Sequence, residues 1–299
     1  IFGDKIMYTI FANGFHDGYG LALAKVMNYP DVVCSPRGQK INECLNVCME
    51  IKDVSLNSFK NPARDLPKDY LYKELILYYS GVNDVGSFGK ASKFWNQLVN
   101  PDNHTVNSAY GHLIFKVRDA YNPMFPEVNK HGDMSLAFTQ WDWAKTCLIK
   151  DKDSRQAVMH YNRPSHQWFG NKDFVCTMSN QFFIRSNKLY LTTYIRSNDC
   201  IKGITFDIPW FISLMYVMKN ELQAFYPELE LGSYTHFAGS LHIYERDFEL
   251  VNNMLKNEFI HDSIKMPEVT DNPILNPNSA WINYLRDELK KYDNIKFIE

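Results

Sequence analysis

The sequence has 299 residues, of which 45% are hydrophobic and 22% charged, with a formal net charge of −2. A chain of this length buries a large core, as one big domain or two ordinary ones. The near-neutral charge gives no general attraction to nucleic acid or membranes, no apolar run is long enough to span a membrane, and the first residues lack the layout of a signal peptide.

Along the chain, residues 1–30 are predicted to be an N-terminal extension of one continuous domain at 31–299. The next segment, "INECLNVCMEI", contains Cys44 and Cys48, which have the separation of a metal-binding pair. They fit equally well as packing residues on a helix face, and no second pair stands at zinc-site spacing, so we expect no metal. The chain has six cysteines without the pattern of a disulfide framework, which favours a reducing, cytoplasmic location.

Two helices are predicted in the first half, "DLPKDYLYKELILYYSG", which ends at Gly81, and "DMSLAFTQWDWAKTCLI". From Arg155 onward the β-branched and aromatic runs "RQAVMHY", "DFVCTMSNQFFIRSN" and "KLYLTTYIRSND" predict strands, with a turn at Ser186-Asn187. A buried helix "IPWFISLMYVMKNEL", a strand "YTHFAGSLHIYERD", a loop "TDNPILNPNSA" and a last helix "AWINYLRDELKKY" follow. The order predicts an α+β fold, a central mixed sheet packed by helices.

Taken singly, the polar residues of the second half have structural explanations. Cys176 fits a small buried hydrophobe in a strand, and Arg196 and Asp199 fit an ion pair at a strand end. His242 and Tyr244 share one face of a strand and fit a polar edge of the core. Together they gather a thiol, a guanidinium, carboxylates, an imidazole and a phenol, and an arginine beside a cysteine favours the reactive thiolate.

Their order resembles that of the thymidylate synthase superfamily. The likeness rests on "FVCTMSNQFFIR", "YIRSNDCIKGITFDIPW", "GSLHIYERDF", "YKELILYYSG" and "VNSAYGHLIF", and covers roughly residues 30–255. Within the superfamily, "MHYNRPSHQW" and Thr177, where thymidylate synthases usually have His, resemble the phage deoxycytidylate hydroxymethylase branch. The resemblance implies a sheet-mediated homodimer that acts on a pyrimidine deoxynucleoside monophosphate with 5,10-methylenetetrahydrofolate as co-substrate.

The resemblance also implies residue roles. Cys176 supplies the thiolate that adds to carbon 6 of the pyrimidine, so that carbon 5 becomes nucleophilic. Glu74 holds a water and assists proton transfers, and Tyr110 supports proton removal from carbon 5. The implied substrate contacts are Arg37, Arg155 from the partner subunit, Arg196, Ser197, Gln181, Asp207, His242 and Tyr244, and the implied folate contacts are Asp199, Trp95 and Gly203. Gln156 departs from the family, which usually has a second consecutive arginine there.

Asp207 is the most informative single position, because thymidylate synthases have Asn in the equivalent place. An amide matches uracil, whereas a carboxyl group accepts from the amine of cytosine. Asp207 also fits a helix N-cap before Ile208-Pro209. The sequence therefore favours deoxycytidylate, with a deoxyuridylate hydroxymethylase or a thymidylate synthase as alternatives, and it leaves hydration versus hydride transfer and ribose versus deoxyribose open.

Two alternatives come from other classes. A Cys-His hydrolase using Cys176 and His242 would need a strained elbow between a strand and a helix, whereas "FVCTMSNQFF" runs on as strand. A relative that binds nucleotide without turnover conflicts with the intact Cys176, Glu74 and Arg196, although Gln156 is compatible with it.

Overall fold

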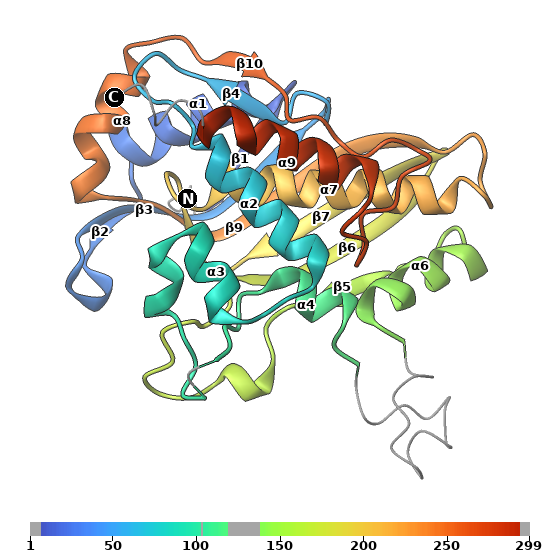
Figure 1. Cartoon of the computed structure of the whole chain (residues 1–299). Coiled ribbons are helices and arrows are strands. Elements are labelled where there is room, and N and C mark those ends of the chain that lie inside the picture. The colour runs from blue at the N-terminus through green and yellow to red at the C-terminus, as the bar shows by residue number, and fades with distance from the viewer. Residues whose placement is uncertain (1–6, 103, 119–137, 294–299) are drawn as a thin grey trace.

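A computed structural model describes residues 7–102, 104–118 and 138–293 (Figure 1). Its centre is an eight-stranded sheet in the order β1-β3-β9-β7-β6-β5, with β2 paired to β3 and β8 paired to β9. The strands are β1 (Tyr8–Ala12), β2 (Val32–Cys34), β3 (Ile41–Ile51), β5 (Val158–His160), β6 (Thr177–Arg185), β7 (Lys188–Ile195), β8 (Asn198–Asp199) and β9 (Glu230–Tyr244). A separate antiparallel pair joins β4 (Ser58–Lys60) to β10 (Ile260–Asp262).

The sheet is mixed, because β1 and β3 run parallel, β9 and β7 run parallel, and the other neighbours along the main path run antiparallel. β6 and β7 form a hairpin around Ser186 and Asn187, whose φ angles are 48° and 56°. Two left-handed residues are what a tight hairpin turn requires, and Asn tolerates that conformation well. The predicted turn is confirmed.

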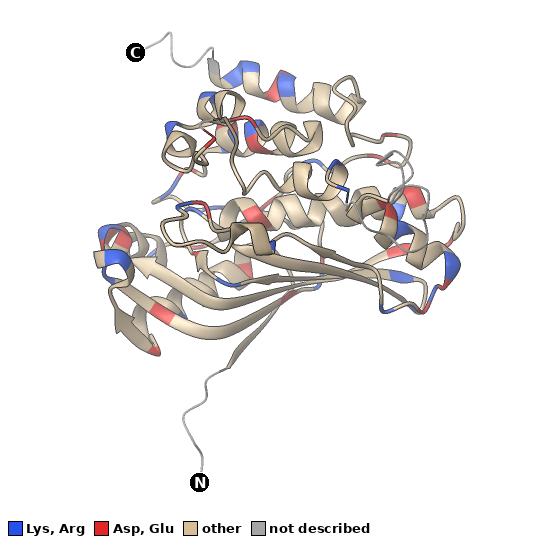
Figure 2. Cartoon of the chain, turned by 90° about the horizontal axis from the view of Figure 1, so that it is seen from below, with Lys and Arg blue, Asp and Glu red and all other residues tan. Residues whose placement is uncertain are grey.

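The described helices lie on one side of this sheet, and the other side is bare (Figure 2). They are α1 (Phe15–Asn28), α2 (Lys68–Ser80), α3 (Val85–Ala91), α4 (Tyr110–Phe115), α6 (Gln140–Lys150), α7 (Ile204–Leu222), α8 (Phe248–Leu255) and α9 (Ala280–Asp293). α7 is apolar all round and packs on β7 and β9, so it is the central helix of the core. None of the described helices is long and apolar enough to cross a membrane.

The α+β prediction is confirmed, and three of its details are wrong. Residues 41–51 form strand β3 rather than a helix, because an apolar run of this length fits either element and pairing with β9 selects the strand. Helix α6 begins at Gln140, later than predicted, and residues 133–137 of that prediction lie outside the described residues. Cys176 lies just before β6, in the loop that enters it.

The predicted helix that ends at Gly81 and the predicted last helix are both present. α2 ends at Ser80, and Gly81 caps it with a φ of 66°, a left-handed conformation that glycine adopts without strain. The loop at 270–280 leads into α9 as predicted. The division at residue 30 stays a prediction; β1 and α1, from the first segment, pack against β3 and share its core.

Candidate active site

The Cys176 loop is tied to the residue that follows β7. The backbone N–H of Arg196 donates to the Cys176 carbonyl at 2.9 Å, and its Nε donates to the Val175 carbonyl at 3.1 Å. Nη2 donates to the Phe174 carbonyl and lies 3.7 Å from the Cys176 Sγ. The predicted neighbourhood of thiol and guanidinium is therefore present, and Arg196 is not in an ion pair with Asp199 among the described contacts.

Burial and charge act on the Cys176 thiol in opposite directions. Burial raises its pKa most, the Arg196 charge lowers it, and the carboxylates of Asp207 and Asp173 raise it again. The net effect is a pKa above the ordinary value of 9.0. Arginine thus favours the thiolate as expected, but desolvation is the larger effect in this structure.

Glu74 lies on the buried side of α2, held by tyrosines one turn away on each side. Its Oε1 accepts hydrogen bonds from the Tyr70 hydroxyl at 2.7 Å and the Tyr78 hydroxyl at 3.2 Å. Burial raises the pKa of Glu74 to about 7 despite these bonds. The Trp95 indole donates to the Tyr70 hydroxyl at 3.2 Å, so Trp95 supports the tyrosine that holds Glu74.

Asp207 lies inside the first turns of α7, whose N-cap is Gly203. The N-cap interpretation of Asp207 is therefore wrong. Its Oδ2 accepts from the Asn198 amide at 2.7 Å, and burial raises its pKa to about 6 while that hydrogen bond lowers it. The carboxyl group is partly buried at the start of the core helix, with one described partner for that oxygen.

Tyr110 is the first residue of α4 and lies near Tyr78, Asp207 and Cys176. Its ring stacks on Tyr78 with centroids 5.1 Å apart. Burial raises the pKa of the Tyr110 hydroxyl well above its usual value, and the charges of Asp207 and Cys176 add to the rise. Helices α2, α4 and α7 and the Cys176 loop therefore bring a thiol, a phenol and two carboxyl groups into one another's electrostatic field.

The end of β9 contributes a second group of predicted residues. The His242 and Tyr244 rings are in edge-to-face contact, with centroids 5.1 Å apart. β8 runs beside them, with Asp199 paired to His242 in register. The Asp199 Oδ1 accepts from the Ile201 backbone N–H at 2.7 Å. This places the predicted sugar and folate contacts on adjoining strands.

The remaining predicted residues are more dispersed. Arg37 lies in a left-handed turn with a φ of 53°, and its charge reaches both Cys176 and Tyr244. Gln181 is on β6 and donates to the Arg155 carbonyl at 2.9 Å, and Arg155 is exposed. By strand alternation Gln181 points to the bare side of the sheet, because its neighbour Phe182 is buried under the helices.

Several residues that support the site were not predicted. Tyr70 and Tyr78 stand four residues from Glu74, a helical spacing that a search around the glutamate would have found. Asn198 lies between two predicted site residues, Ser197 and Asp199, but nothing in its spacing points to Asp207, and His236 stands in a strand without a motif. Asp173 accepts a hydrogen bond from the backbone N–H of Ser108 at 2.9 Å. This bond links the segment just before Tyr110 to the segment just before Cys176.

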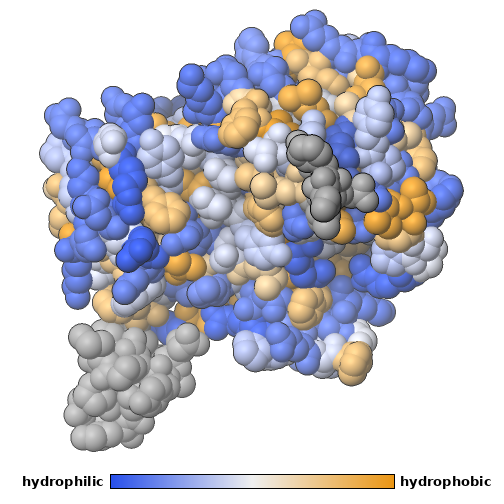
Figure 3. Space-filling view, turned by 180° about the vertical axis from the view of Figure 1, so that it is seen from behind, coloured by the Kyte–Doolittle hydropathy of each residue, from blue (hydrophilic) through white to orange (hydrophobic). Residues whose placement is uncertain are grey.

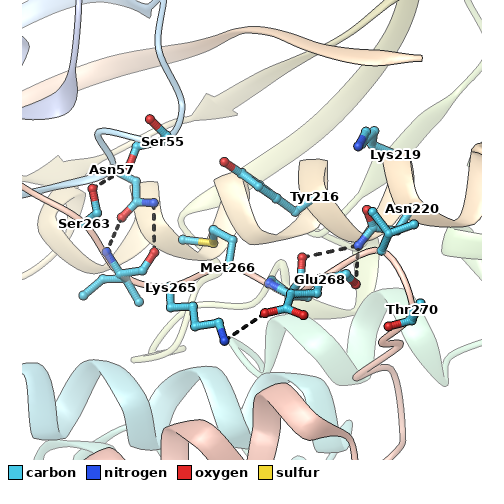
Figure 4. A pocket seen from close by; sticks show the side chains of 13 residues that line it. Ser55, Asn57, Tyr216, Lys219, Asn220, Ser263, Lys265, Met266, Glu268 and Thr270 are labelled. Carbon is cyan, nitrogen blue, oxygen red and sulfur yellow. Dashed lines mark hydrogen bonds and ion pairs between the residues drawn. The ribbon is translucent and has the colours of Figure 1, made fainter. Parts of the chain in front are cut away.

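Outside this cluster, a groove of about 670 Å³ runs between α7 and the chain after β10 (Figure 4). Its lining includes Tyr216, Lys219 and Asn220 from α7, and Lys265 and Glu268, which form an ion pair of 2.9 Å. None of its lining residues is a predicted site residue. Among the described residues, no group of three His, Cys, Asp or Glu side chains is arranged to hold a metal ion.

Comparisons with known proteins point to the same family as the sequence motifs do. The family model described as thymidylate synthase matches residues 54–291. The deoxycytidylate 5-hydroxymethyltransferases of Enterobacteria phages T6 and T4 are each 31% identical to this chain, over 66% and 67% of its length and 75% and 76% of theirs. The deoxyuridylate hydroxymethyltransferase of Bacillus phage SP01 is 27% identical over 97% of this chain and 74% of its own length.

Among solved structures, thermostable thymidylate synthase A from Bacillus subtilis superposes with a TM-score of 0.62 at 18% identity, covering 85% of this chain and 87% of that one. This similarity carries the fold alone. The resemblance seen in the sequence, including its likeness to the phage deoxycytidylate enzymes, is confirmed by the sequence matches. The chain belongs to the thymidylate synthase family and is a transferase.

Proposed function

We propose that the enzyme converts dCMP, 5,10-methylenetetrahydrofolate and water to 5-hydroxymethyl-dCMP and tetrahydrofolate. The observation that carries the choice of base is Asp207, a partly buried carboxyl group within the field of Cys176 whose Oδ2 is held by Asn198. An ionised carboxylate is acceptor-only and matches the exocyclic amine of cytosine. The named relatives in phages T6 and T4 act on deoxycytidylate and support this choice.

The reaction begins with the Cys176 thiol, which loses its proton as sulfur adds to carbon 6 of the base. The adduct makes carbon 5 nucleophilic, and carbon 5 attacks the methylene carbon that the folate supplies. Because the pKa of Cys176 is raised, a proton acceptor has to accompany the addition. Glu74, with a pKa of about 7, is matched to exchanging protons near neutral pH.

Loss of the carbon 5 proton and of tetrahydrofolate leaves an exocyclic methylene group. Water adds there, the sulfur leaves carbon 6, and the product carries a hydroxymethyl group. Tyr110 begins α4 beside the Glu74 helix and is the proposed aid to proton removal from carbon 5. Glu74 would hold the attacking water, which accounts for a carboxyl group buried among tyrosine hydroxyls.

Phosphate would be held by arginine forks, which match its geometry better than lysine does. Arg196, Ser197 and Arg37 supply this site in the proposal, and His242 and Tyr244 hold the sugar 3'-hydroxyl. Gln181, whose side chain points to the bare side of the sheet, is left out of the proposed contacts in its own subunit's site. Asp199, Trp95 and Gly203 are the proposed folate contacts; a pterin N–H would compete for the Asp199 Oδ2, which now lies 4.0 Å from the Arg246 Nη2.

A homodimer through the bare side of the sheet is part of the proposal. That side, turned to the viewer in Figure 3, has orange and pale side chains over its middle. Phe11 is 76% exposed, and Tyr194, 38% exposed, packs its ring 5.2 Å from that of Phe237. Aromatic and weakly polar surface of this kind is typical of subunit interfaces. The proposed location is the cytoplasm, that of the host if a phage encodes the chain.

Arg155 would reach the phosphate in the partner subunit's site. Mixing Arg155→Ala with Cys176→Ser, each inactive alone, is expected to restore activity. A heterodimer would have one site with both defects and one site with neither, so random pairing gives about a quarter of the wild-type rate. Sedimentation measures the dimer independently, and a dimer whose mixed variants stay inactive would place Arg155 in its own subunit's site.

The proposed reaction is tested by tritium release from 5-tritiated dCMP and dUMP with methylenetetrahydrofolate, followed by the mass of the product. Release from dCMP with a hydroxymethyl product is expected, and Cys176→Ser should abolish it. Release from neither nucleotide would contradict the proposal.

The second candidate is a deoxyuridylate hydroxymethylase. It is favoured by the relative from phage SP01, whose match extends over 97% of this chain. Release from dUMP alone, with a hydroxymethyl product, would select it over the dCMP reaction. A methyl product would indicate thymidylate synthesis instead.

A further inference from the structure

A line of hydrogen bonds leads from Asp207 away from the site and into the sheet. The Asn198 Nδ2 donates to the Asp207 Oδ2 at 2.7 Å, and the Asn198 Oδ1 lies 2.8 Å from the His236 Nε2. The His236 Nδ1 lies 2.9 Å from the Tyr234 hydroxyl. Asn198, His236 and Tyr234 come from β8 and β9 and are buried, whereas Asp207, on α7, is partly exposed.

The line continues beyond Tyr234. Thr193 on β7 forms a side-chain hydrogen bond with the Tyr234 hydroxyl. The Thr193 Oγ1 accepts from the Asn180 Nδ2 at 2.6 Å, and the Asn180 Oδ1 accepts from the Tyr161 hydroxyl. Four strands of the sheet, β8, β9, β7 and β6, therefore support the orientation of one carboxyl group on α7.

The donor and the acceptor in each of these hydrogen bonds follow from the protonation state of His236 and the charge of Asp207. Burial lowers the pKa of His236 to about 3, so its ring is neutral, with one nitrogen donating and the other accepting. If Nδ1 accepts from Tyr234, Nε2 donates to the Asn198 oxygen and the Asn198 amide N–H₂ faces Asp207. The reverse direction would turn the Asn198 oxygen toward the carboxylate and leave that contact repulsive.

We propose that Asn198, His236 and Tyr234 form a positioning relay that occupies the Asp207 Oδ2 and leaves Oδ1 to pair with the base. This inference rests on the proposed function, in which Asp207 recognises the pyrimidine. The relay sets base specificity through Asp207 without touching the base itself. Without the Asn198 hydrogen bond the carboxyl group would bind a proton more readily, and a protonated carboxyl group can donate to a carbonyl as well as accept from an amine, so its discrimination between the two would fall.

The backbone around Asn198 is built to admit its side chain. A Cβ atom at Gly203, the N-cap of α7, would lie 2.7 Å from the Asn198 Nδ2. The added Cβ would also lie 2.9 Å from the Asp199 carbonyl oxygen, which is backbone, so glycine leaves room for the amide without a shift of the chain. The Gly203 position, predicted as a folate contact, thus also has a structural reason to lack a side chain.

Other ionisable groups also act on Asp207 and must stay constant in a test. Glu74, Tyr70 and Tyr78 act from α2, Tyr110 from α4, Tyr234 from β9, and Cys176 and Asp199 from the loop before β6 and from β8. A variant that removes only a neutral hydrogen-bond donor leaves the charges of these groups in place. Asn198→Ala is such a variant, and Tyr234→Phe removes a hydroxyl that is itself neutral, because burial raises the pKa of Tyr234 well above its usual value.

The first experiment compares the ratio of kcat/KM for the preferred base to that for the other base. Asn198→Ala is expected to lower this ratio about tenfold, the usual effect of one lost hydrogen bond to a charged group, and Tyr234→Phe to lower it by a smaller factor. Tyr79→Phe is the matched control, because it also loses a buried tyrosine hydrogen bond, to the Ser213 Oγ at 2.9 Å, in another part of the core. A loss of packing alone would leave the ratio unchanged in all three variants.

The second experiment does not depend on turnover. The Asp207 carboxyl carbon is followed by NMR over pH in aspartate-labelled protein, with Asp207→Asn for assignment. Since the Asn198 hydrogen bond lowers the Asp207 pKa, Asn198→Ala is expected to raise it, and Tyr79→Phe to leave it unchanged. If wild-type protein turns over neither nucleotide, the proposed function fails and this titration alone decides the relay. An unchanged titration, or an unchanged base ratio in an active enzyme, would overturn the relay.

Discussion

At Cys176, burial raises the pKa of the thiol and the neighbouring Arg196 lowers it, and burial is the larger effect. Alkylation by iodoacetamide, which reacts with the thiolate, is therefore expected to rise with pH through a midpoint above 9.0. Arg196→Met removes the lowering charge, so the midpoint should move higher and the rate at pH 8 should fall about tenfold for each pKa unit gained. Peptide mass spectrometry separates Cys176 from the other cysteines.

Arg185→Met is the matched control for this measurement. Its guanidinium lies over the Phe183 ring at 5.7 Å, on the same strand hairpin, and has no described contact with Cys176. A midpoint below 9.0 in the wild type, or no change in Arg196→Met, would contradict the balance of burial and charge described for this thiol.

Residues of the site differ in how far their sequence context predicts them. Cys176 and Asp207 stand in spaced motifs, and the structure brings both into one electrostatic cluster. Asn198 and His236 could not be predicted, because their importance arises from a contact across 38 residues and from burial rather than from local spacing. The thiol's raised pKa was also missed, since a sequence shows the neighbouring arginine but not the degree of desolvation.

At the scale of elements, the approach of α4 to α2 positions Tyr110 near Glu74. A Cβ atom at Gly111 would lie 1.6 Å from the Tyr78 carbonyl oxygen, which is backbone and cannot move alone. Gly111→Ala is therefore expected to push the two helices apart and to cost about 2–4 kcal/mol of unfolding free energy. Activity should fall beyond the loss of folded protein, because Tyr110 begins the displaced helix.

Gly86→Ala on α3 is the control for replacing a glycine within a helix. The nearest atom to its added Cβ is a side-chain oxygen of Asp84 at 3.3 Å, so the replacement meets no backbone atom. Its unfolding free energy should change by no more than about 1 kcal/mol. Denaturant unfolding gives both values. If Gly111→Ala were as stable as Gly86→Ala, the close packing of α4 on α2 would be wrong.

Elements were predictable where local chemistry determines them. The Ser186-Asn187 turn and the Gly81 cap follow from residues that adopt left-handed backbone easily, and both are present. β3 was predicted as a helix face because "INECLNVCMEI" has no strict alternation of apolar and polar residues. Its strand conformation comes from pairing with β1 and β9, which are distant in the sequence, so tertiary contacts outweigh the local pattern.

At the scale of the whole molecule, a buried acid of the candidate site lowers the free energy of unfolding as it ionises. Glu74 has a pKa of about 7 in the folded chain and 4.5 as its ordinary value. Below 4.5 both states are protonated, and the folded state keeps its full stability from this group. As pH rises toward 7, the unfolded state loses its proton first, so the free energy of unfolding falls.

Glu74→Gln should remove this dependence. The raised pKa of Glu74 corresponds to about 3 kcal/mol of unfolding free energy, which the wild type loses between pH 4.5 and 7. Glu74→Gln should therefore be more stable than the wild type at pH 8. It should also be inactive. Thermal or denaturant unfolding of both proteins from pH 5 to 8 measures the difference. The exposed Glu228→Gln is the control for a simple change of net charge. If Glu74→Gln and the wild type lost stability in parallel over this range, Glu74 would not be the buried acid that the structure describes, and its place beside the reacting base would have to be abandoned.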